Sequence, residues 1–595
     1  MAMKSLIKEN KMMATVQSVR WERIFMYLDV RVETVDQKEK VGKLEFYAVN
    51  ELYYATAKFK VIGVEGNIYH LKLNVTNNGE NECVPSGEYR IIVCQNGCQM
   101  SDCETDTDIV ADMPDFSRTF LYATQTKSYT ITFYVEEDAD TLPFRFFILA
   151  ASRTQMNFPV KTHLRNKIHW IKDIQSTWGS RKNVLRSIYG FYRFLYASKR
   201  KNTILFMTEQ NKKIASNLKA VSERMVERGM DKEYRILYSA RSAAAESQSI
   251  KSWIELMKKM AQSGIIFIDD HAPLLDWLKL GDDTKLMQLW HAGAGFKSSG
   301  YSRWGHMGCP NAVSCHRQYN FGIAGSKNIA PFFSEVWGIN DEQVLPTGMP
   351  RMDEYLDKEY REKKTKELYG KYPLCKGKKV MLFAPTYRGR NKKTAYYPYD
   401  MIDFKGLYEA CGEEYVVLFK MHPWVSSKVP IEKQYQDKFI DVGKYPNIND
   451  LFYITDLLVT DYSSNIFEYS LMRKPMLFFA YDKIQYSFSR GFHRAYEESA
   501  PGKVCYTFEE LLEAFKQEDF EYEKVEDYIE HHFDHIDSHA SDRVIDWLIL
   551  GRLPEDIVAD LKQVEQDNAY RKTLDFLPEG CRRDAVEGVI KEGDK

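Results

Sequence analysis

The sequence predicts an α/β protein in which an all-β N-terminal domain precedes two Rossmann-like units. Short β-branched and aromatic runs, separated by turn residues, fill residues 15 to about 150. From residue 203 onward, short apolar runs alternate with helical stretches, which is the pattern of a parallel sheet with crossover helices. The same alternation begins again near residue 378, so it indicates a second unit of the same kind.

Shifts in composition divide the chain into five segments. The predicted segments are a β-domain at 1–155, a basic linker at 156–202, two Rossmann-like domains at 203–355 and 356–548, and a charged helical tail at 549–595. The β-domain contains several strand-like runs, among them FMYLDVRVE and SYTITFYVE, and we expect a small β-sandwich. The tail either crosses back to the first Rossmann-like unit or trails off.

The linker carries charge of almost one sign. Between residues 161 and 201 there are eleven Lys or Arg residues and one acid, Asp173, with aromatic side chains interleaved. A basic helix with an aromatic face favours an anionic membrane surface. The alternative is a linker helix that packs on a neighbouring domain. The side chains that we expect to meet the membrane are Lys167, Trp170, Arg181, Lys182, Arg186 and Arg193.

Composition argues against several classes of protein. The chain has 82 Lys and Arg against 84 Asp and Glu, so we expect no general basic surface for nucleic acid. No apolar run reaches the length of a spanning helix, and the N-terminus lacks the apolar core of a signal peptide. The ten scattered cysteines read as reduced thiols. We expect no metal or other cofactor, and we favour a structural role for the acidic pair Asp269-Asp270.

Polar residues end the apolar runs of both units, and ligands of doubly wound sheets bind beyond the carboxyl ends of the strands. His291 follows the run LMQLW and precedes Ala-Gly-Ala-Gly. Gly293 and Gly295 in this segment allow close approach of the backbone and expose amides to an oxyanion. A histidine at such a place can act as a general base near neutral pH. The alternative is a structural histidine that caps a helix.

The second unit offers cationic side chains at its strand ends. His422 ends the run VVLFKMH, and Lys420 lies two residues earlier on the same face of the strand. A cation beside an imidazole suits a phosphate, whereas the alternative is a buried structural histidine. Arg388, just after Thr386, can clamp phosphates with two N–H groups, and Arg351 closes the first unit in a similar way.

A further strand end carries hydroxyl and carboxylate groups. The segment Asp461-Tyr-Ser-Ser-Asn-Ile-Phe-Glu468 follows the run DLLVT. Ser463 and Ser464 can cap the next helix while its first amides bind a phosphate. Glu468 lies about one turn later, where a carboxylate can hold ribose hydroxyls. Simple helix capping is the alternative.

The order of these motifs is more specific than any single motif. Along the chain follow Trp290-His291, Thr347-Gly348-x-Pro350-Arg351-x-Asp353, Ala384-Pro385-Thr386-x-Arg388, His422-Pro423 and Thr460-Asp461-Tyr462-Ser463-Ser464. Over residues 203–547 this series resembles the CDP-glycerol glycerophosphotransferase family of teichoic acid polymerases. The run after His291, Ala-Gly-Ala-Gly-Phe-Lys, departs from the Trp-His-Gly-Thr-Pro of glycerol-type polymerases and is similar to the ribitol-phosphate polymerases.

The resemblance implies a GT-B-like pair of domains, with a CDP-alditol donor held mainly by the second. It also implies a lipid-linked teichoic acid acceptor, whose terminal hydroxyl attacks the alditol-bearing phosphate while CMP leaves. We therefore expect His291 to remove the acceptor proton, and His422, Lys420 and Arg388 to neutralise charge on the diphosphate. Lys420 departs from the Arg that the family often has, which keeps the charge but loses the fork.

The remaining donor-site residues follow from the same resemblance. We expect Ser463 and Ser464 to hold phosphate oxygens and Glu468 to anchor the ribose. The other residues assigned to the CDP-alditol site are Gly293, Gly295, Arg351, Thr386 and Asp461.

Several alternatives stay open at this point. A GT-B glycosyltransferase with a nucleotide-sugar donor fits the same strand ends, a glycerol- or capsule-type transferase fits the family, and a non-catalytic scaffold would dock other enzymes. The β-domain either binds the growing polymer or mediates self-association into a homo-oligomer. We expect a peripheral protein at the cytoplasmic face of the cell membrane.

Overall fold

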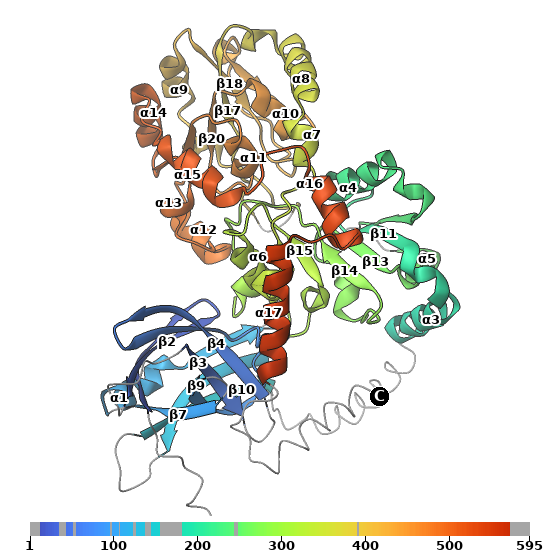
Figure 1. Cartoon of the computed structure of the whole chain (residues 1–595). Coiled ribbons are helices and arrows are strands. Elements are labelled where there is room, and N and C mark those ends of the chain that lie inside the picture. The colour runs from blue at the N-terminus through green and yellow to red at the C-terminus, as the bar shows by residue number, and fades with distance from the viewer. Residues whose placement is uncertain are drawn as a thin grey trace, which may run out of the picture.

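Three sheets organise the part of the chain that the computed structural model describes (Figure 1). The described residues are 12–34, 43–50, 55–95, 98–105, 107–122, 127–136, 144–154, 181–242, 248–306, 308–389 and 392–571. A ten-stranded sheet comes first, and two six-stranded parallel sheets follow it along the chain. The prediction of two Rossmann-like units after an all-β region is therefore confirmed.

The N-terminal domain is one continuous sheet and not the two-sheet sandwich that we expected. Its strands are β1 Met12–Glu22, β2 Phe25–Thr34, β3 Leu44–Asn50, β4 Ala55–Glu65, β5 Ile68–Asn74, β6 Gly87–Gln95, β7 Cys98–Thr105, β8 Arg118–Tyr122, β9 Lys127–Glu136 and β10 Phe144–Thr154. The first seven strands follow the order β1-β2-β5-β4-β3-β6-β7, and β1 pairs with β7 at Ala14 and Cys103. This pairing joins the two outer strands of the set, so a barrel-like closure removes the exposed edges that an open sheet would leave.

The core of the β-domain is completed by residues of the first Rossmann-like unit. Trp304 is buried and stacks on Tyr129, with 5.7 Å between the ring centroids, and it meets Tyr122 edge-on at 5.5 Å. Tyr301 is fully buried in the same cluster. Because these residues follow closely after His291, the β-domain anchors the far end of the loop that His291 begins.

The first parallel sheet has the strand order β12-β11-β13-β14-β15-β16. Its strands are β11 Thr203–Thr208, β12 Arg235–Ala240, β13 Ile265–Ile268, β14 Lys285–Gln288, β15 Phe321–Ile323 and β16 Val344–Leu345, and its main helices are α4 Ser216–Glu227, α5 Ile250–Gln262 and α6 Ala330–Trp337. Every residue of β11 is buried, as in a strand that is covered on both faces. The strand order reverses between β11 and β13, which makes their carboxyl ends the switch point of this sheet.

The second parallel sheet has the order β19-β18-β17-β20-β21-β22. Its strands are β17 Lys379–Phe383, β18 Tyr415–Phe419, β19 Phe439–Asp441, β20 Leu457–Thr460, β21 Met476–Phe479 and β22 Lys503–Cys505, and nearby helices are α7 Met352–Leu356, α10 Ile448–Leu451, α11 Ile466–Ser470 and α12 Lys483–Ser489. The order reverses between β17 and β20, so ligands are expected beyond the carboxyl ends of these two strands. Thr386 and Asp461 follow β17 and β20, respectively, at this switch point.

The last helices return to the first half of the chain. They are α16, Ala540–Val544, and α17, Glu555–Arg571. Arg224 on α4 donates two hydrogen bonds of 2.9 Å to the carboxylate of Asp542 on α16. The α17 helix then runs from the first parallel sheet toward the β-domain (Figure 1), where Asp567 pairs with Lys58 at 3.1 Å. The C-terminal helices thus connect the first parallel unit with the β-domain.

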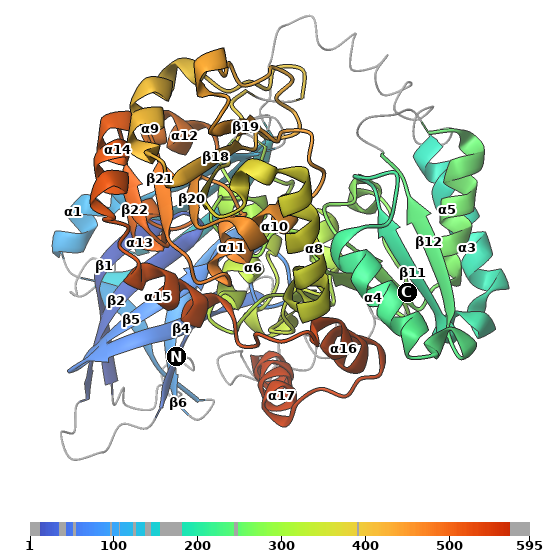
Figure 2. The ribbon, with the colours of Figure 1, turned by 90° about the horizontal axis from the view of Figure 1, so that it is seen from above.

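The end of the basic linker forms helix α3, Arg181–Leu195, which lies beside α5 at the outer side of the first parallel sheet (Figure 2). Its side chains Leu185 and Tyr189 are buried in the core of this unit. Arg186 donates hydrogen bonds of 2.7 and 2.9 Å to the backbone oxygen of Trp277, and Arg193 forms an ion pair with Asp283. One face of α3 therefore packs on the neighbouring domain.

The opposite part of α3 exposes apolar side chains. Phe194 is 82% exposed and Phe191 is 60% exposed. Of the residues assigned to a membrane surface, Lys167 and Trp170 lie outside the described residues, as does the side chain of Arg181. Among the described residues, none of the helices is long and apolar enough to span a bilayer.

Candidate active site

His291 lies in the loop that leaves β14, and its imidazole is oriented by the backbone of the neighbouring strand. Its Nδ1 atom lies 3.0 Å from the backbone oxygen of Asp269, at the end of β13. A carbonyl oxygen only accepts hydrogen bonds, so Nδ1 carries the proton and Nε2 carries the lone pair. The side chain is about half exposed. When the ring is neutral, this geometry thus presents its basic nitrogen, Nε2, to solvent.

The backbone next to His291 is strained. Trp290 has a φ of +47°, in the left-handed region that residues with a Cβ rarely adopt. Its backbone N–H donates to the side-chain oxygen of Gln288 at 2.8 Å, and its ring meets that of Trp337 edge-on at 5.8 Å. These contacts hold the strained residue, and strain of this kind is often found at functional sites.

The glycines after His291 allow close packing, Gly293 between the two units and Gly295 within the first unit. A Cβ atom at Gly293 would lie 2.6 Å from ring carbons of Phe467 on α11, so only glycine allows this contact. Gly295 has a φ of +60° and lies against Phe332 and Ile329. We expected both glycines to expose amides to a phosphate. The structure shows instead that Gly293 lets the His291 loop pack against the helix that follows Ser463 and Ser464, whereas Gly295 packs within the first unit.

His422 follows β18 and has the opposite tautomer. Its Nδ1 accepts a hydrogen bond of 3.1 Å from the backbone N–H of Trp424, so in the neutral ring the proton is on Nε2. Burial, with Lys297 and Lys420 nearby, lowers the pKa of His422 to about 4. The ring also lies against that of Tyr387, with 4.7 Å between centroids and an angle of 46° between the ring planes. His422 is therefore a neutral N–H donor at ordinary pH.

Arg388 is held between two carboxylates. Its guanidinium donates to Asp461 at 2.9 Å and to Asp482 at 2.5 and 2.8 Å. Burial lowers the pKa of Arg388, but these carboxylates outweigh burial and hold it above its ordinary value. The same Asp461 accepts hydrogen bonds from the backbone N–H and the hydroxyl of Thr386. Arg388, Thr386 and Asp461 thus brace the ends of β17 and β20 against each other.

Glu468 and Arg351 form an ion pair between the two units. The Nε atom of Arg351 lies 2.9 Å from Glu468, and a second guanidinium nitrogen bonds the same oxygen. Both side chains are largely buried, with 15% and 6% of their surface exposed. Nearby, Ser463 is buried and its hydroxyl accepts from the backbone N–H of Asn465 at 3.3 Å, whereas Ser464 is exposed.

Two cations that the motif analysis did not assign lie near His422. Lys297, six residues after His291, forms a backbone bridge to Phe492, and its ammonium lies 5.6 Å from the ring centroid of Tyr486. Arg490 donates to the hydroxyl of Tyr387 at 3.1 Å. The sequence signal for Lys297 is its place in the run after His291. The signal for Arg490 is the segment Arg490-Gly491-Phe492, which the family resemblance includes.

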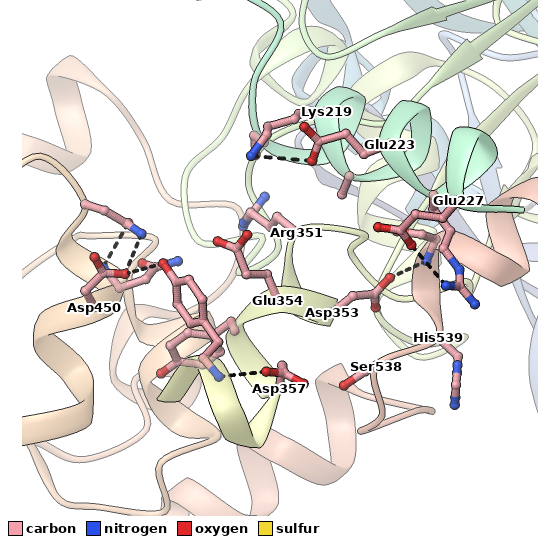
Figure 3. Close-up of a pocket in the computed structure, with 18 of the residues that line it drawn as sticks. Lys219, Glu223, Glu227, Arg351, Asp353, Glu354, Asp357, Asp450, Ser538 and His539 are labelled. Carbon is pink, nitrogen blue, oxygen red and sulfur yellow. Dashed lines mark hydrogen bonds and ion pairs between the residues drawn. The ribbon is translucent and has the colours of Figure 1, made fainter. Parts of the chain in front are cut away.

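A cavity of about 650 Å³ opens beside Arg351, between α4 of the first unit and α7 and α10 near the second (Figure 3). Lys219 and Glu223 of α4 lie on one side of it and Asp450 lies on the other, with Arg351 and Glu354 between them. Arg351 is the residue that this cavity shares with the predicted donor site. The cavity therefore lies next to the ion pair of Arg351 and Glu468, and Arg351 forms part of its wall.

A cluster with metal-binding donors lies elsewhere on the first unit. Ligand atoms of His271, Asp276 and Cys315 lie within 4.8 Å of one another. The same groups already satisfy each other, because His271 Nε2 lies 3.1 Å from Asp276, which also accepts from the backbone N–H of Cys315. Burial lowers the pKa of His271, but Asp276 and Cys315 raise it to about 10. An imidazolium thus satisfies this cluster without an ion.

Residues 190–550 match the family described as CDP-Glycerol:Poly(glycerophosphate) glycerophosphotransferase. Teichoic acid ribitol-phosphate polymerase TarL of Staphylococcus aureus is 29% identical over 560 residues, which are 89% of this chain and 98% of that protein. TarK of the same organism, also a teichoic acid ribitol-phosphate polymerase, is 34% identical over 419 residues, covering 70% of this chain and 81% of that one. The solved structure of the wall teichoic acid polymerase TagF superposes with a TM-score of 0.50 at 25% identity, over 68% of this chain and 100% of that chain.

Proposed function

Because the chain belongs to the CDP-Glycerol:Poly(glycerophosphate) glycerophosphotransferase family, as the order of its motifs predicted, we propose that it transfers ribitol phosphate from CDP-ribitol to a lipid-linked teichoic acid acceptor and releases CMP. The observation that carries the proposal is the pair of histidines with opposite tautomers. His291 of the first unit offers a lone pair, and His422 of the second offers an N–H donor. Such a pair suits a base for the acceptor and a partner for the donor phosphates.

The donor is placed at the switch point of the second sheet. Its diphosphate lies beyond the carboxyl ends of β17 and β20, near His422, Ser463 and Ser464. The ribose lies toward Glu468, and the cytosine continues into the 650 Å³ cavity that begins at Arg351. Asn447 and Asn449 on the wall of that cavity carry amide groups that suit the edge of a pyrimidine.

The chemical step is an in-line displacement at phosphorus. Nε2 of His291 takes the proton of the terminal acceptor hydroxyl, and the oxygen forms a bond to the alditol-bearing phosphorus. The bond between that phosphorus and the CMP oxygen breaks, so CMP leaves with the electron pair. The Nε2–H of His422 donates to a diphosphate oxygen and stabilises the charge that develops there.

Ribitol is favoured over glycerol by the relatives that cover most of the chain, TarL and TarK, both of which are named for ribitol phosphate. The description of the family itself names CDP-glycerol, so CDP-glycerol is the second candidate donor. Which of the two donors is used depends on the groups that surround the alditol.

The acceptor is lipid-linked, so we place the protein at the cytoplasmic face of the membrane. The support is helix α3, whose exposed side chains Val184, Phe191 and Leu195 are spaced by seven and four residues and share one face with Phe194 beside it. Lys182 on this helix adds positive charge. An apolar face beside basic residues binds anionic lipid surfaces.

The test uses the purified full-length chain with a lipid-linked acceptor in anionic vesicles. CDP-ribitol labelled in the ribitol is supplied, and label in the lipid-linked product is measured together with CMP. We expect both to rise together in the wild type and neither to rise with His291→Ala. Label transfer from a UDP-sugar, with UDP released and no CMP, would replace the proposal with a glycosyltransferase.

A further inference from the structure

We propose that Lys297 and Arg490 are the cations that neutralise the donor diphosphate, so that a residue of the first unit completes a site built on the second. This inference rests on the proposed function, since it concerns the same donor. It replaces Arg388 as the main phosphate cation and assigns a role to two residues that were not among the predicted site residues.

The positive charge of Arg388 is already paired with two carboxylates. Asp461 and Asp482 both bond the guanidinium, so this group of three has one more negative charge than positive charge. An ionised diphosphate diester carries one negative charge on each phosphate. A carboxylate-bound guanidinium has few N–H groups left to offer such an anion, and the second carboxylate would repel it. The donor therefore requires other cations.

Lys297 lies near His422, and its ammonium is available to bind a phosphate. Hydrogen bonding between Ser298 N–H and the backbone oxygen of Gly491, at 3.2 Å, holds its loop against the second unit. Within the described part of the chain, its ammonium has no salt bridge and lies over the ring of Tyr486. Its charge is close enough to His422 to contribute to the low pKa of that imidazole. The ammonium and the N–H donor of His422 therefore face one region.

Arg490 is linked to the region of His422 through Tyr387. Its guanidinium donates to the hydroxyl of Tyr387 at 3.1 Å and to the backbone oxygen of Gly389 at 3.2 Å. The ring of Tyr387 in turn lies against that of His422, with 4.7 Å between the ring centroids. No carboxylate pairs with Arg490 among the residues whose placement is described. Two cations without carboxylate partners among the described residues thus lie in the region of one neutral donor, an arrangement that suits an anion with two phosphates.

The pH dependence follows from the surroundings of Lys297. Burial lowers the pKa of Lys297 to about 8, Asp461 opposes this shift, and Arg490 and Arg388 add to it. The remaining groups that face it are His422, which is neutral at this pH, and Tyr486. Above about pH 8 the ammonium loses its proton in the enzyme without donor, so donor affinity falls. Lys297→Arg keeps the charge and removes this fall.

The test measures CMP release at varied CDP-ribitol, together with binding of CDP and of cytidine by calorimetry. We expect Lys297→Ala and Arg490→Ala each to raise the donor KM on the order of 10- to 100-fold. This is the effect expected when one or two charge-assisted hydrogen bonds to the donor are lost. Both substitutions should weaken the binding of CDP and leave the binding of cytidine unchanged. Lys297→Arg should retain most of the affinity, and Lys285→Ala, at the exposed start of β14, serves as the matched control.

Two outcomes separate the inference from the proposed function. Folded Lys297→Ala and Arg490→Ala variants, with unchanged thermal unfolding and unchanged affinity for CDP, would overturn the inference while the transferase activity stands. A wild type that releases no CMP from any CDP-alditol would overturn the proposed function, and the comparison of CDP with cytidine would still decide whether Lys297 and Arg490 bind the diphosphate.

Discussion

The Nδ1 atom of His291 lies 3.0 Å from the backbone oxygen of Asp269, and this contact fixes the lone pair on Nε2. A backbone acceptor cannot be changed by substitution at Asp269, so the tautomer is determined by the fold of β13. The two histidines of the site thus differ in their hydrogen-bond partners. Replacement by glutamine is therefore expected to have a different effect at each of them.

His291→Gln should be as inactive as His291→Ala. A glutamine amide provides N–H groups but no basic nitrogen, so it cannot take the acceptor proton. We expect kcat to fall on the order of 10²- to 10⁴-fold in both variants, with little change in affinity for CDP. The measurement is CMP release at saturating donor, and a His291→Gln variant with near wild-type kcat would contradict the role of a base.

His422→Gln should retain more activity than His422→Ala, because the glutamine amide places an N–H donor close to the position of Nε2. We expect the alanine variant to lose on the order of 10- to 100-fold in kcat/KM and the glutamine variant to lose less than about tenfold. Equal losses in the two variants would show that the N–H group is not used.

The pH profile gives a second check on His422. Its pKa of about 4 keeps the imidazole neutral above about pH 5, so its ionisation should not appear in the rate profile there. The folded pKa lies below the unfolded value of about 6.5, so the folded state binds fewer protons and stability falls as the pH drops from about 6.5 to 4. His422→Gln should reduce this acid loss in urea unfolding.

Arg351 and Glu468 should be coupled in stability. Each single replacement, Arg351→Met or Glu468→Gln, leaves a largely buried charge without its partner, which costs about 3–5 kcal/mol for a buried pair. The double variant should lose less than the sum of the two. Urea unfolding of the four proteins measures the coupling, and additive losses would show that the pair contributes nothing as a pair.

The apolar face of α3 should control membrane attachment. Phe191→Ser with Phe194→Ser should reduce flotation with anionic vesicles by removing the two most exposed aromatic side chains of the helix. Ile484→Ser, which replaces an apolar residue of similar exposure on α12, is the control. Flotation that is equal in both variants and the wild type would refute the assignment of this face to lipid.

The strand ends were predictable because they depend on local pattern. Alternation of apolar runs and helices gave both parallel sheets, and His291 and His422 were found as the polar residues that ended such runs. The closure of the β-domain was not predictable, because it depends on β1 pairing with β7, which lies far along the chain. Alternation within a strand reports which face is buried and says little about the partner strand.

The charge balance of the site was equally hidden from the sequence. Arg388 is paired with Asp482, which lies 94 residues later at the end of another strand, so a motif that ends at Arg388 cannot show that its charge is already used. Lys297 is held near the second unit by its backbone bridge to Phe492 and by the hydrogen bond from Ser298 N–H to the backbone oxygen of Gly491, far away in the sequence. Contacts between residues so far apart in the sequence depend on how the two units pack. The spacing of residues along one strand does not show this packing.

The most direct test of the central claim is the nucleotide released when the wild type is given CDP-ribitol, CDP-glycerol and UDP-sugars in separate reactions with a lipid-linked acceptor. We predict CMP from CDP-ribitol, at a rate that exceeds the rate with CDP-glycerol and that depends on His291. Release of UDP from a UDP-sugar without release of CMP from either CDP-alditol would contradict the account.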